Sequence, residues 1–228
     1  MKGKVAIITG SSKGLGFAIA HQLLEEGATV IGWSRSETSI DHANFQSSQV
    51  DVGDEDQVKA NFNKVLSEFG SVDIIVNNAG FGVYSSLEDM NSDVLRQMFD
   101  TNVFGIFYLI KAAIPSMKEA KSGHIINVSS IAGIAGIENM SVYNATKFAV
   151  KGMSESLFKE LRPHGIKVTC VLPGSISTNF FDEIPEFSSN TNMMHPKDVA
   201  DTIIHSLKAP ASMHHVNLEL RPFKSPNS

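Results

Sequence analysis

The sequence predicts an α/β fold in which a parallel sheet carries helices on both faces. Short β-branched runs alternate with longer amphipathic segments along the 228 residues, which is the order of elements in such folds. The runs, for example Val5–Thr9 and Ile166–Leu172, are apolar without polar alternation. That pattern is typical of strands buried on both faces, and therefore of a doubly wound sheet with right-handed helical crossovers.

Each expected strand is a short run rich in valine, isoleucine or threonine, the residues that suit a buried strand. Residues with turn preference, such as glycine, asparagine and aspartate, follow most of these runs. The third run is the shortest and the most polar. The expected strands are Val5–Thr9, Thr29–Trp33, Ser48–Val50, Asp73–Val76, His124–Val128, Ile166–Leu172 and Val216–Leu220.

Each expected helix has an apolar stripe and a recognisable end. Gly27 ends the first and Gly70 the second, because glycine readily adopts the conformation that closes a helix. Asn102 divides the third segment into two parts, and Ser141 is a candidate N-cap for the fourth. The expected helices are Gly14–Glu26, Asp54–Phe69, Ser92–Lys118, Val142–Arg162 and Pro196–Leu207.

The composition excludes several classes of protein. With 42% hydrophobic and 19% charged residues, the chain is expected to fold into a globular protein. A net charge of −5 disfavours nucleic acid or an anionic membrane as the main partner. The single cysteine, Cys170, excludes an intrachain disulfide and a multi-cysteine zinc site. The eight histidines form no metal-binding pattern, so no metal site is expected.

The chain is expected to form one domain over residues 1–228, because no linker rich in proline, glycine or serine divides it. No apolar run reaches the roughly 18 residues of a membrane span. The first ten residues lack the layout of a signal peptide. A cytoplasmic location is therefore the expectation.

A glycine-rich turn follows the first expected strand and opens the first expected helix. Glycine lets the backbone approach a pyrophosphate, and the helix N-terminus offers free N–H groups. The spacing is G-x-x-x-G-x-G rather than the common G-x-G-x-x-G. The alternative is a glycine-rich turn that binds nothing. The turn reads Thr9-Gly10-Ser11-Ser12-Lys13-Gly14-Leu15-Gly16.

The end of the second expected strand favours NADP(H) over NAD(H). The common fingerprint places an acid about 20 residues after the turn, where it binds the ribose 2′-OH. This strand instead ends in Trp33-Ser34-Arg35, without an acid. Arg35 and Lys13 could bind a 2′-phosphate. The alternative is that both are ordinary exposed cations.

Tyr143 and Lys147 are four residues apart on an expected helix and therefore share one face. A phenol has a pKa of about 10, and a nearby ammonium would lower it, so the pair could transfer a proton near neutral pH. Ser130 follows the fifth expected strand, at the edge where ligands bind in open α/β sheets. Taken alone, such a Tyr/Lys pair is usually part of a helix surface.

Two further motifs stand in order with these. Asn77-Asn78-Ala79-Gly80 follows the fourth expected strand, and Pro173-Gly174 follows the sixth. Together with the glycine-rich turn, Ser130 and Tyr143-x-x-x-Lys147, they make the chain similar to the short-chain dehydrogenase/reductase family over about residues 4–178. The resemblance implies a seven-stranded parallel Rossmann-type sheet and an NAD(P)-dependent oxidoreductase.

The resemblance also implies roles for individual residues. Tyr143 would be the general acid/base, Lys147 would lower its pKa and hold the nicotinamide ribose, and Ser130 would polarise the substrate carbonyl. Asn102 would support a proton relay, and Asp51 would contact the adenine. The residues implied to bind NADP(H) are Gly10, Ser12, Lys13, Gly14, Leu15, Gly16, Ser34, Arg35, Asp51, Val52, Asn78, Ala79, Gly80, Tyr143, Lys147, Pro173, Gly174, Ile176 and Thr178.

Two places distinguish this chain within the resemblance. The acid that selects NAD in the family falls at the place of Ser34, so Ser34-Arg35 resembles the NADP-preferring pattern. The C-terminal segment from His215 to Pro222 lacks the Asp-Gly-Gly ending of many members. It is weakly similar to the subgroup of 3-hydroxy acid (serine-type) dehydrogenases.

The expected function is hydride transfer between NADP(H) and a small molecule, interconverting a carbonyl and a secondary alcohol with Tyr143 as acid/base. A 3-oxoacyl or 3-hydroxy acid substrate is one candidate. The alternative is a catalytically silent NADP-binding protein that acts as a redox sensor or scaffold. The complete set of Ser130, Tyr143, Lys147 and Asn102 favours the enzyme, because a binding module has no need of it.

The substrate loop is expected at residues 179–195. Its apolar side chains could form a lid over the substrate, or could simply pack on the core. Val83 and Tyr84 are also candidates to face the substrate. No paired cations await a carboxylate, since Arg162, Lys167 and Arg221 are expected to be surface charges. The apolar residues of the loop are Phe180, Phe181, Ile184, Phe187, Met193 and Met194.

A homodimer or homotetramer is expected from two helical segments. Phe104–Met117 and Val142–Leu161 carry more apolar and small residues than one core-facing stripe requires. In the family that the chain resembles, subunits commonly form dimers and tetramers through these two helices.

Overall fold

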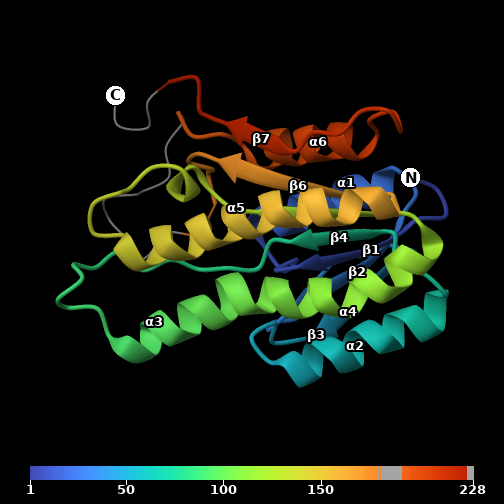
Figure 1. Ribbon diagram of the computed structural model, residues 1–228, viewed down its shortest axis with the longest axis horizontal. Coiled ribbons are helices and arrows are strands. Elements are labelled where there is room, and N and C mark those ends of the chain that lie inside the picture. The colour runs from blue at the N-terminus through green and yellow to red at the C-terminus, as the bar shows by residue number, and fades with distance from the viewer. Residues whose placement is uncertain (179, 181–191, 225–228) are drawn as a thin grey trace.

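Seven parallel strands form one sheet in the order β3-β2-β1-β4-β5-β6-β7 (Figure 1). The computed structural model describes residues 1–178, 180 and 192–224. The strand order reverses between β1 and β4, and in open α/β sheets a ligand crevice lies at such a point. The predicted fold class is confirmed. The strands are β1 Val5–Thr9, β2 Thr29–Ser34, β3 Phe45–Gln49, β4 Ile74–Asn77, β5 Gly123–Val128, β6 Ile166–Pro173 and β7 Asn217–Leu220.

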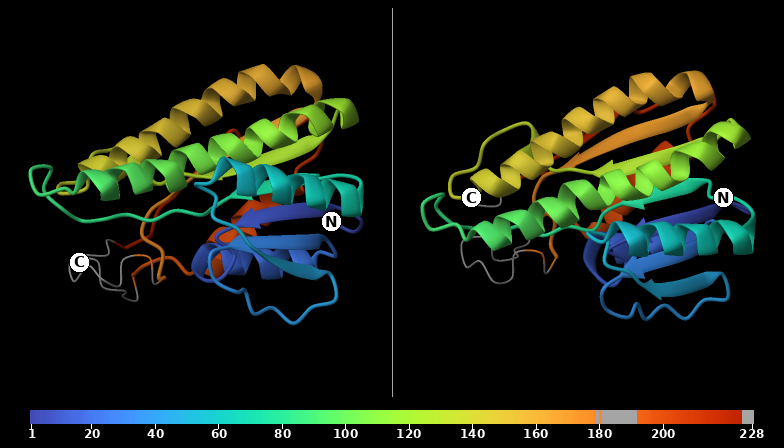
Figure 2. Two further views of the ribbon diagram at one scale, coloured as in Figure 1. Left: turned by 90° about the horizontal axis from the view of Figure 1, so that it is seen from below. Right: turned by 60° about the horizontal axis from the view of Figure 1, so that its bottom comes forward.

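Helices cover both faces of the sheet, as Figure 2 shows from two directions. α2, α4 and α5 pack on one face through residues such as Phe62, Leu109 and Val150. α1 and α6 pack on the other through residues such as Ile19 and Ile203. The helices are α1 Gly14–Glu25, α2 Glu55–Phe69, α3 Ser92–Phe99, α4 Gly105–Ala120, α5 Ser141–Leu161 and α6 Pro196–Leu207.

The third strand is where the sequence prediction was wrong. The strand is Phe45–Gln49 rather than Ser48–Val50, and most of its side chains are half-buried or exposed. It is an edge strand whose register is set by backbone pairing with β2, from Val30 opposite Phe45 to Ser34 opposite Gln49. Backbone hydrogen bonds leave no apolar pattern in the sequence, so the hydrophobic signal could not locate it.

The helical segment around Asn102 divides as the sequence predicts. A π-helical turn, Asp100–Phe104, joins α3 to α4 and buries Asn102 completely. Such turns inside helices are rare and often lie at functional sites.

The N-terminal ends of two helices are capped in different ways. α2 has Asp54 as its N-cap, whose carboxylate accepts the Gln57 backbone N–H at 3.0 Å. Ser141 is not the N-cap of α5, because the helix already begins there and Met140 occupies the cap position without a side-chain bond. Hydrophobic cover substitutes for capping at this end, since Met140 is buried.

Within the ranges that the structure describes, no helix is both long and apolar enough to cross a membrane. The cytoplasmic location stays a prediction.

Candidate active site

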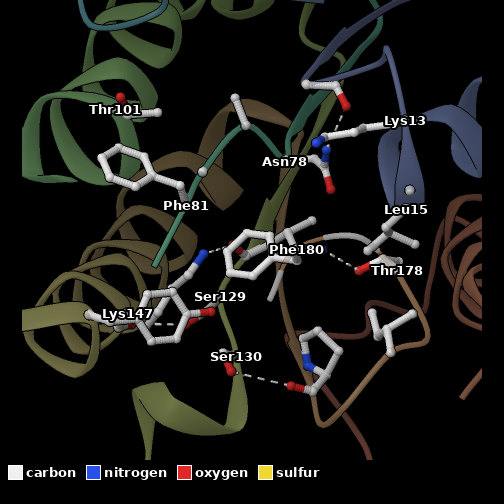
Figure 3. Close-up of a pocket in the computed structure, with 18 of the residues that line it drawn as sticks. Lys13, Leu15, Asn78, Phe81, Thr101, Ser129, Ser130, Lys147, Thr178 and Phe180 are labelled. Atoms are coloured by element: carbon white, nitrogen blue, oxygen red, sulfur yellow. Dashed lines mark hydrogen bonds between the residues drawn. The ribbon is translucent and has the colours of Figure 1, made fainter. Parts of the chain in front are cut away.

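A cavity of about 680 Å³ lies at the carboxyl ends of the strands (Figure 3). It gathers Ser130, Tyr143 and Lys147 with all of the predicted cofactor residues except Gly16. The cavity therefore joins a long groove for a dinucleotide to a group that can transfer a proton. The residues of the predicted set that line it are Gly10, Ser12, Lys13, Gly14, Leu15, Ser34, Arg35, Asp51, Val52, Asn78, Ala79, Gly80, Ser130, Tyr143, Lys147, Pro173, Gly174, Ile176 and Thr178.

The glycine-rich turn needs glycine at two places for different reasons. Gly10 has a φ of +67°, and a Cβ there would lie 2.9 Å from the Cα of Ala79. A Cβ on Gly16 would overlap the carbonyl oxygen of Gly10. Gly16 therefore packs the first turn of α1 against the loop instead of lining the cavity, a division of labour typical of dinucleotide-binding turns.

The N-terminus of α1 is open to an anion. Lys13 occupies the cap position and makes no side-chain hydrogen bond to the first turn. The N–H groups of a first helical turn have no partner inside the helix, and they carry the positive end of the helix dipole. Because the cavity is lined by Ser12, Lys13 and Gly14, this end fits a pyrophosphate.

Asn78 fastens the loop after β4 to the glycine-rich turn. Its amide Nδ2 donates to the carbonyl oxygens of Thr9 at 3.0 Å and Gly10 at 3.2 Å. In return, the hydroxyl of Thr9 accepts the backbone N–H groups of Asn78 and Ala79, both at 3.0 Å. Four hydrogen bonds thus fix two segments 69 residues apart in the chain, which builds a rigid wall for the cavity.

The predicted 2′-phosphate end carries two cations, Lys13 and Arg35, which are exposed and line the cavity. Among the described residues, neither of them forms an ion pair. Ser34 is buried, and its hydroxyl bonds the carbonyl of Ser36 and the hydroxyl of Thr38. A small serine at the end of β2 therefore leaves room beside Arg35 where an acid would repel a phosphate.

The first two turns of α5 place Tyr143 and Lys147 side by side. The Lys147 Nζ lies 5.6 Å from the centre of the Tyr143 ring and donates to the Val128 carbonyl at 3.0 Å. Ser130 stands at the end of β5, where its hydroxyl accepts the Ala132 N–H at 3.1 Å and reaches the Pro173 carbonyl at 3.4 Å. Strand ends and one helix face thus converge on one proton-transfer group.

Burial sets the charge of this group. It raises the pKa of Tyr143 to about 12, although a hydrogen bond with Ser130 acts in the opposite direction. It also lowers the pKa of Lys147 to about 8. Desolvation of the phenolate is the largest cause of the shift at Tyr143, and the predicted role of Lys147 in lowering the tyrosine pKa stays a prediction. At neutral pH the structure therefore holds a protonated phenol beside a mostly protonated ammonium.

Asn102 lies behind this group rather than on the cavity wall. Its Nδ2 donates to the Phe81 carbonyl at 2.8 Å and to the Thr146 hydroxyl at 3.1 Å, and its Oδ1 accepts the Phe81 N–H at 3.0 Å. A Cβ on Gly80 would lie 3.0 Å from that oxygen and 3.7 Å from the Lys147 Nζ. Asn102, the predicted relay residue, thus lies close to Lys147 and also anchors the loop at Phe81.

The substrate end has an apolar wall that the sequence only partly revealed. Phe81, Ile137, Met140, Phe180 and Met193 line the cavity here. Figure 3 shows the Phe180 ring pointing into the cavity between Lys147 and Thr178, and its centre lies 6.0 Å from that of Tyr143. The sequence did not assign Phe81, Ile137 and Met140 to this wall. They lie in loops without periodicity, so no pattern in the sequence could identify them.

The two predicted substrate segments have different outcomes. Among the described residues of the first, Phe81 lines the cavity, whereas Val83 and Tyr84 do not. Both pack behind the lining, in an apolar cluster with Met140 and Tyr143, and their contact with the substrate stays a prediction. In the predicted loop 179–195, residues 179 and 181–191 lie outside the described residues. Its ends are joined by backbone bonds between Ser177 and Met194 at 2.9 Å and between Met194 and Ser175 at 3.0 Å.

Comparison with known proteins gives a consistent result. Residues 4–189 match the family model for short chain dehydrogenases. A 3-ketodihydrosphingosine reductase of Bacteroides thetaiotaomicron is 38% identical over 210 residues, which cover 91% of this chain and 76% of that protein. A short-chain dehydrogenase structure from Streptomyces avermitilis has a TM-score of 0.87 at 31% identity, covering 95% of this chain and 87% of that one.

A solved structure with NADP bound, ElxO, has a TM-score of 0.88 at 28% identity and covers 97% of this chain and 98% of its own. The family model spans most of the chain and includes every motif from the glycine-rich turn to Thr178. The likeness thus extends from sequence to fold. This chain belongs to the short-chain dehydrogenase/reductase family.

Proposed function

We propose that this protein reduces a ketone to a secondary alcohol with NADPH. The observation that carries the proposal is the meeting of Ser130, Tyr143 and Lys147 at one end of a cavity whose other end has an open helix N-terminus and two exposed cations. A related protein named as a keto reductase and a structural neighbour with NADP bound support it.

The residues divide the work between binding and proton transfer. Gly10, Lys13 and the first turn of α1 would hold the pyrophosphate, and Arg35 the 2′-phosphate. The chemistry that the cofactor supplies is hydride transfer to the carbonyl carbon. Tyr143 would donate the proton that the oxygen then needs, and Ser130 would hold that oxygen by a hydrogen bond.

The charge state favours reduction. The pKa of Tyr143, raised to about 12 by burial, keeps its proton in place at neutral pH. The ammonium of Lys147 would stabilise the phenolate that forms as the proton leaves. Asn102 would act as a positioning residue, because it fixes the Phe81 loop and reaches the Thr146 hydroxyl one residue before Lys147.

Replacing one oxygen atom tests the proposal. Tyr143→Phe removes the proton donor while keeping the ring, so kcat for NADPH-dependent ketone reduction should fall by at least about 1,000-fold, within the range of a general acid. NADPH affinity, measured by fluorescence titration, should change by less than about threefold, since one hydroxyl contact is a small part of the binding energy.

Tyr108→Phe is the matched control, because it removes the same atom from a half-buried tyrosine on α4 outside the cavity. Its kcat should stay close to that of the wild type. Retention of wild-type kcat by Tyr143→Phe would overturn the assignment of this residue. Tight NADPH binding without reduction of any ketone by the wild type would instead favour a silent binding protein.

A further inference from the structure

Of the described residues that line the cavity, the charged ones are Lys13, Arg35, Asp51 and Lys147. The first three lie at the cofactor end, around the predicted positions of the phosphate and adenine groups. Lys147 lies beside Tyr143, where it is buried and its Nζ is bonded to the Val128 carbonyl. Among the described lining residues, no cation is left over for an anionic group on the substrate.

The described stretches of chain that supply the substrate-end lining contain no lysine or arginine. They are residues 81–84, 131–146, 175–178, 180 and 192–196. Their one histidine, His195, precedes α6 and is not among the lining residues. Their one carboxylate, Glu138, is exposed and lies in the sequence between the lining residues Ile137 and Met140.

The part of the apolar wall around Ile137 is held in place by hydrogen bonds. The buried Asn144 side chain donates to the carbonyls of Ala132 at 2.7 Å and Ala135 at 2.6 Å, and accepts the Ile137 N–H at 3.2 Å. Asn139, whose φ is +57°, lies in the same loop as Ile137. Its carbonyl accepts the Ser85 N–H at 2.7 Å, which ties this loop to the segment after β4.

We infer that the substrate is a ketone with a neutral, apolar body, and that a carboxylate carried on that body is rejected. The inference rests on the proposed reductase function and narrows its substrate class. An anion beside Ile137, Met140 and Phe180 would lose its hydration without gaining a cation, which is costly. Free 3-oxo acids and 3-hydroxy acids are therefore poor candidates.

A matched pair of substrates tests this inference. With NADPH, kcat/KM should be at least about tenfold higher for methyl 6-oxoheptanoate than for 6-oxoheptanoate, equal to about 1.4 kcal/mol of discrimination. The two ketones differ only in the charge of the distant group. A ratio below tenfold overturns the inference but leaves the reductase function standing. If the wild type reduces neither compound and also fails to reduce 2-octanone, this result counts against the proposed function itself.

A charge placed in the wall gives a second test. Ile137→Lys adds a cation to the cavity lining and should lower the ester-to-acid ratio of kcat/KM by at least about tenfold. Ala120→Lys adds the same charge at the exposed end of α4 and should leave the ratio unchanged. Equal ratios in the two variants would contradict the inference. Should Ile137→Lys fail to fold, the wild-type ratio alone decides.

Discussion

Single side chains carry the proposed choice between NADP(H) and NAD(H). At the end of β2, Ser34 turns inward to Thr38, while Arg35 and Lys13 stay exposed at the cavity. An acid at Ser34 would repel a 2′-phosphate, whereas a guanidinium can bind it through two hydrogen bonds. The proposed preference for NADP(H) therefore depends on very few atoms, and it can be measured residue by residue.

Reversing the charge at Arg35 tests that preference. Arg35→Asp should raise the KM for NADPH by at least about tenfold, because a charge-assisted pair becomes a repulsion. The KM for NADH should change by less than about threefold. Steady-state kinetics with both cofactors provide the measurement, and Lys64→Glu, on the exposed face of α2, is the control for charge reversal. Equal changes for NADPH and NADH would contradict the assigned role.

At the scale of elements, the buried residue His124 lies on β5, next to β6. It is at the opposite end of β5 from Ser130. The Nε2 of His124 lies 2.9 Å from the Thr169 hydroxyl. Burial, with smaller contributions from His214, Lys167 and His215, lowers the pKa of His124 to about 3. The folded state therefore keeps this ring neutral at a pH where the unfolded chain, with a histidine pKa of about 6.5, binds a proton.

This difference predicts acid sensitivity. Below about pH 6.5 the unfolded state binds the extra proton, so the free energy of unfolding falls as the pH falls. Between pH 7 and pH 5, His124 should account for about 2 kcal/mol of that loss. In His124→Gln this part of the loss should disappear from urea unfolding curves, with the exposed His164→Gln as matched control. The same pH dependence in wild type and His124→Gln would sink this account.

At the scale of the whole molecule, one helical layer leaves large apolar side chains in solvent. Phe104, just before α4, is 44% exposed and Phe107, on α4, is 45% exposed. Phe148 on α5 is 48% exposed. Isolated exposed apolar residues are common, but a set of aromatic residues on one layer is typical of an interface. The homodimer or homotetramer expected from the sequence stays a prediction that this surface supports.

Light scattering measures that prediction directly. The wild type should have at least twice the mass of a single chain. Phe148→Glu should raise the dissociation constant of the oligomer by at least about tenfold, because a buried carboxylate without a partner is costly. Leu87→Glu, at a residue 68% exposed before α3, adds the same charge outside this surface and should leave the mass unchanged. A wild-type mass of one chain would count against association.

The sequence alone determined the fold class, most strand positions and a set of candidate cofactor residues that, apart from Gly16, line one cavity. Buried parallel strands and amphipathic helices leave periodic apolar patterns, and close backbone contacts at Gly10 and Gly16 leave glycines, so both can be recognised without coordinates. The order of motifs along the chain also identified Ser130, Tyr143 and Lys147 as a group.

Only the tertiary structure decided the features that depend on contacts between distant segments. The edge strand β3 is defined by its pairing with β2, and the apolar wall of Phe81, Ile137 and Met140 comes from loops without periodicity. The direction of the Tyr143 pKa also required the fold, because desolvation depends on how completely neighbouring segments enclose the ring. Substrate choice belongs to this second group, since it is decided by which loops meet at the cavity.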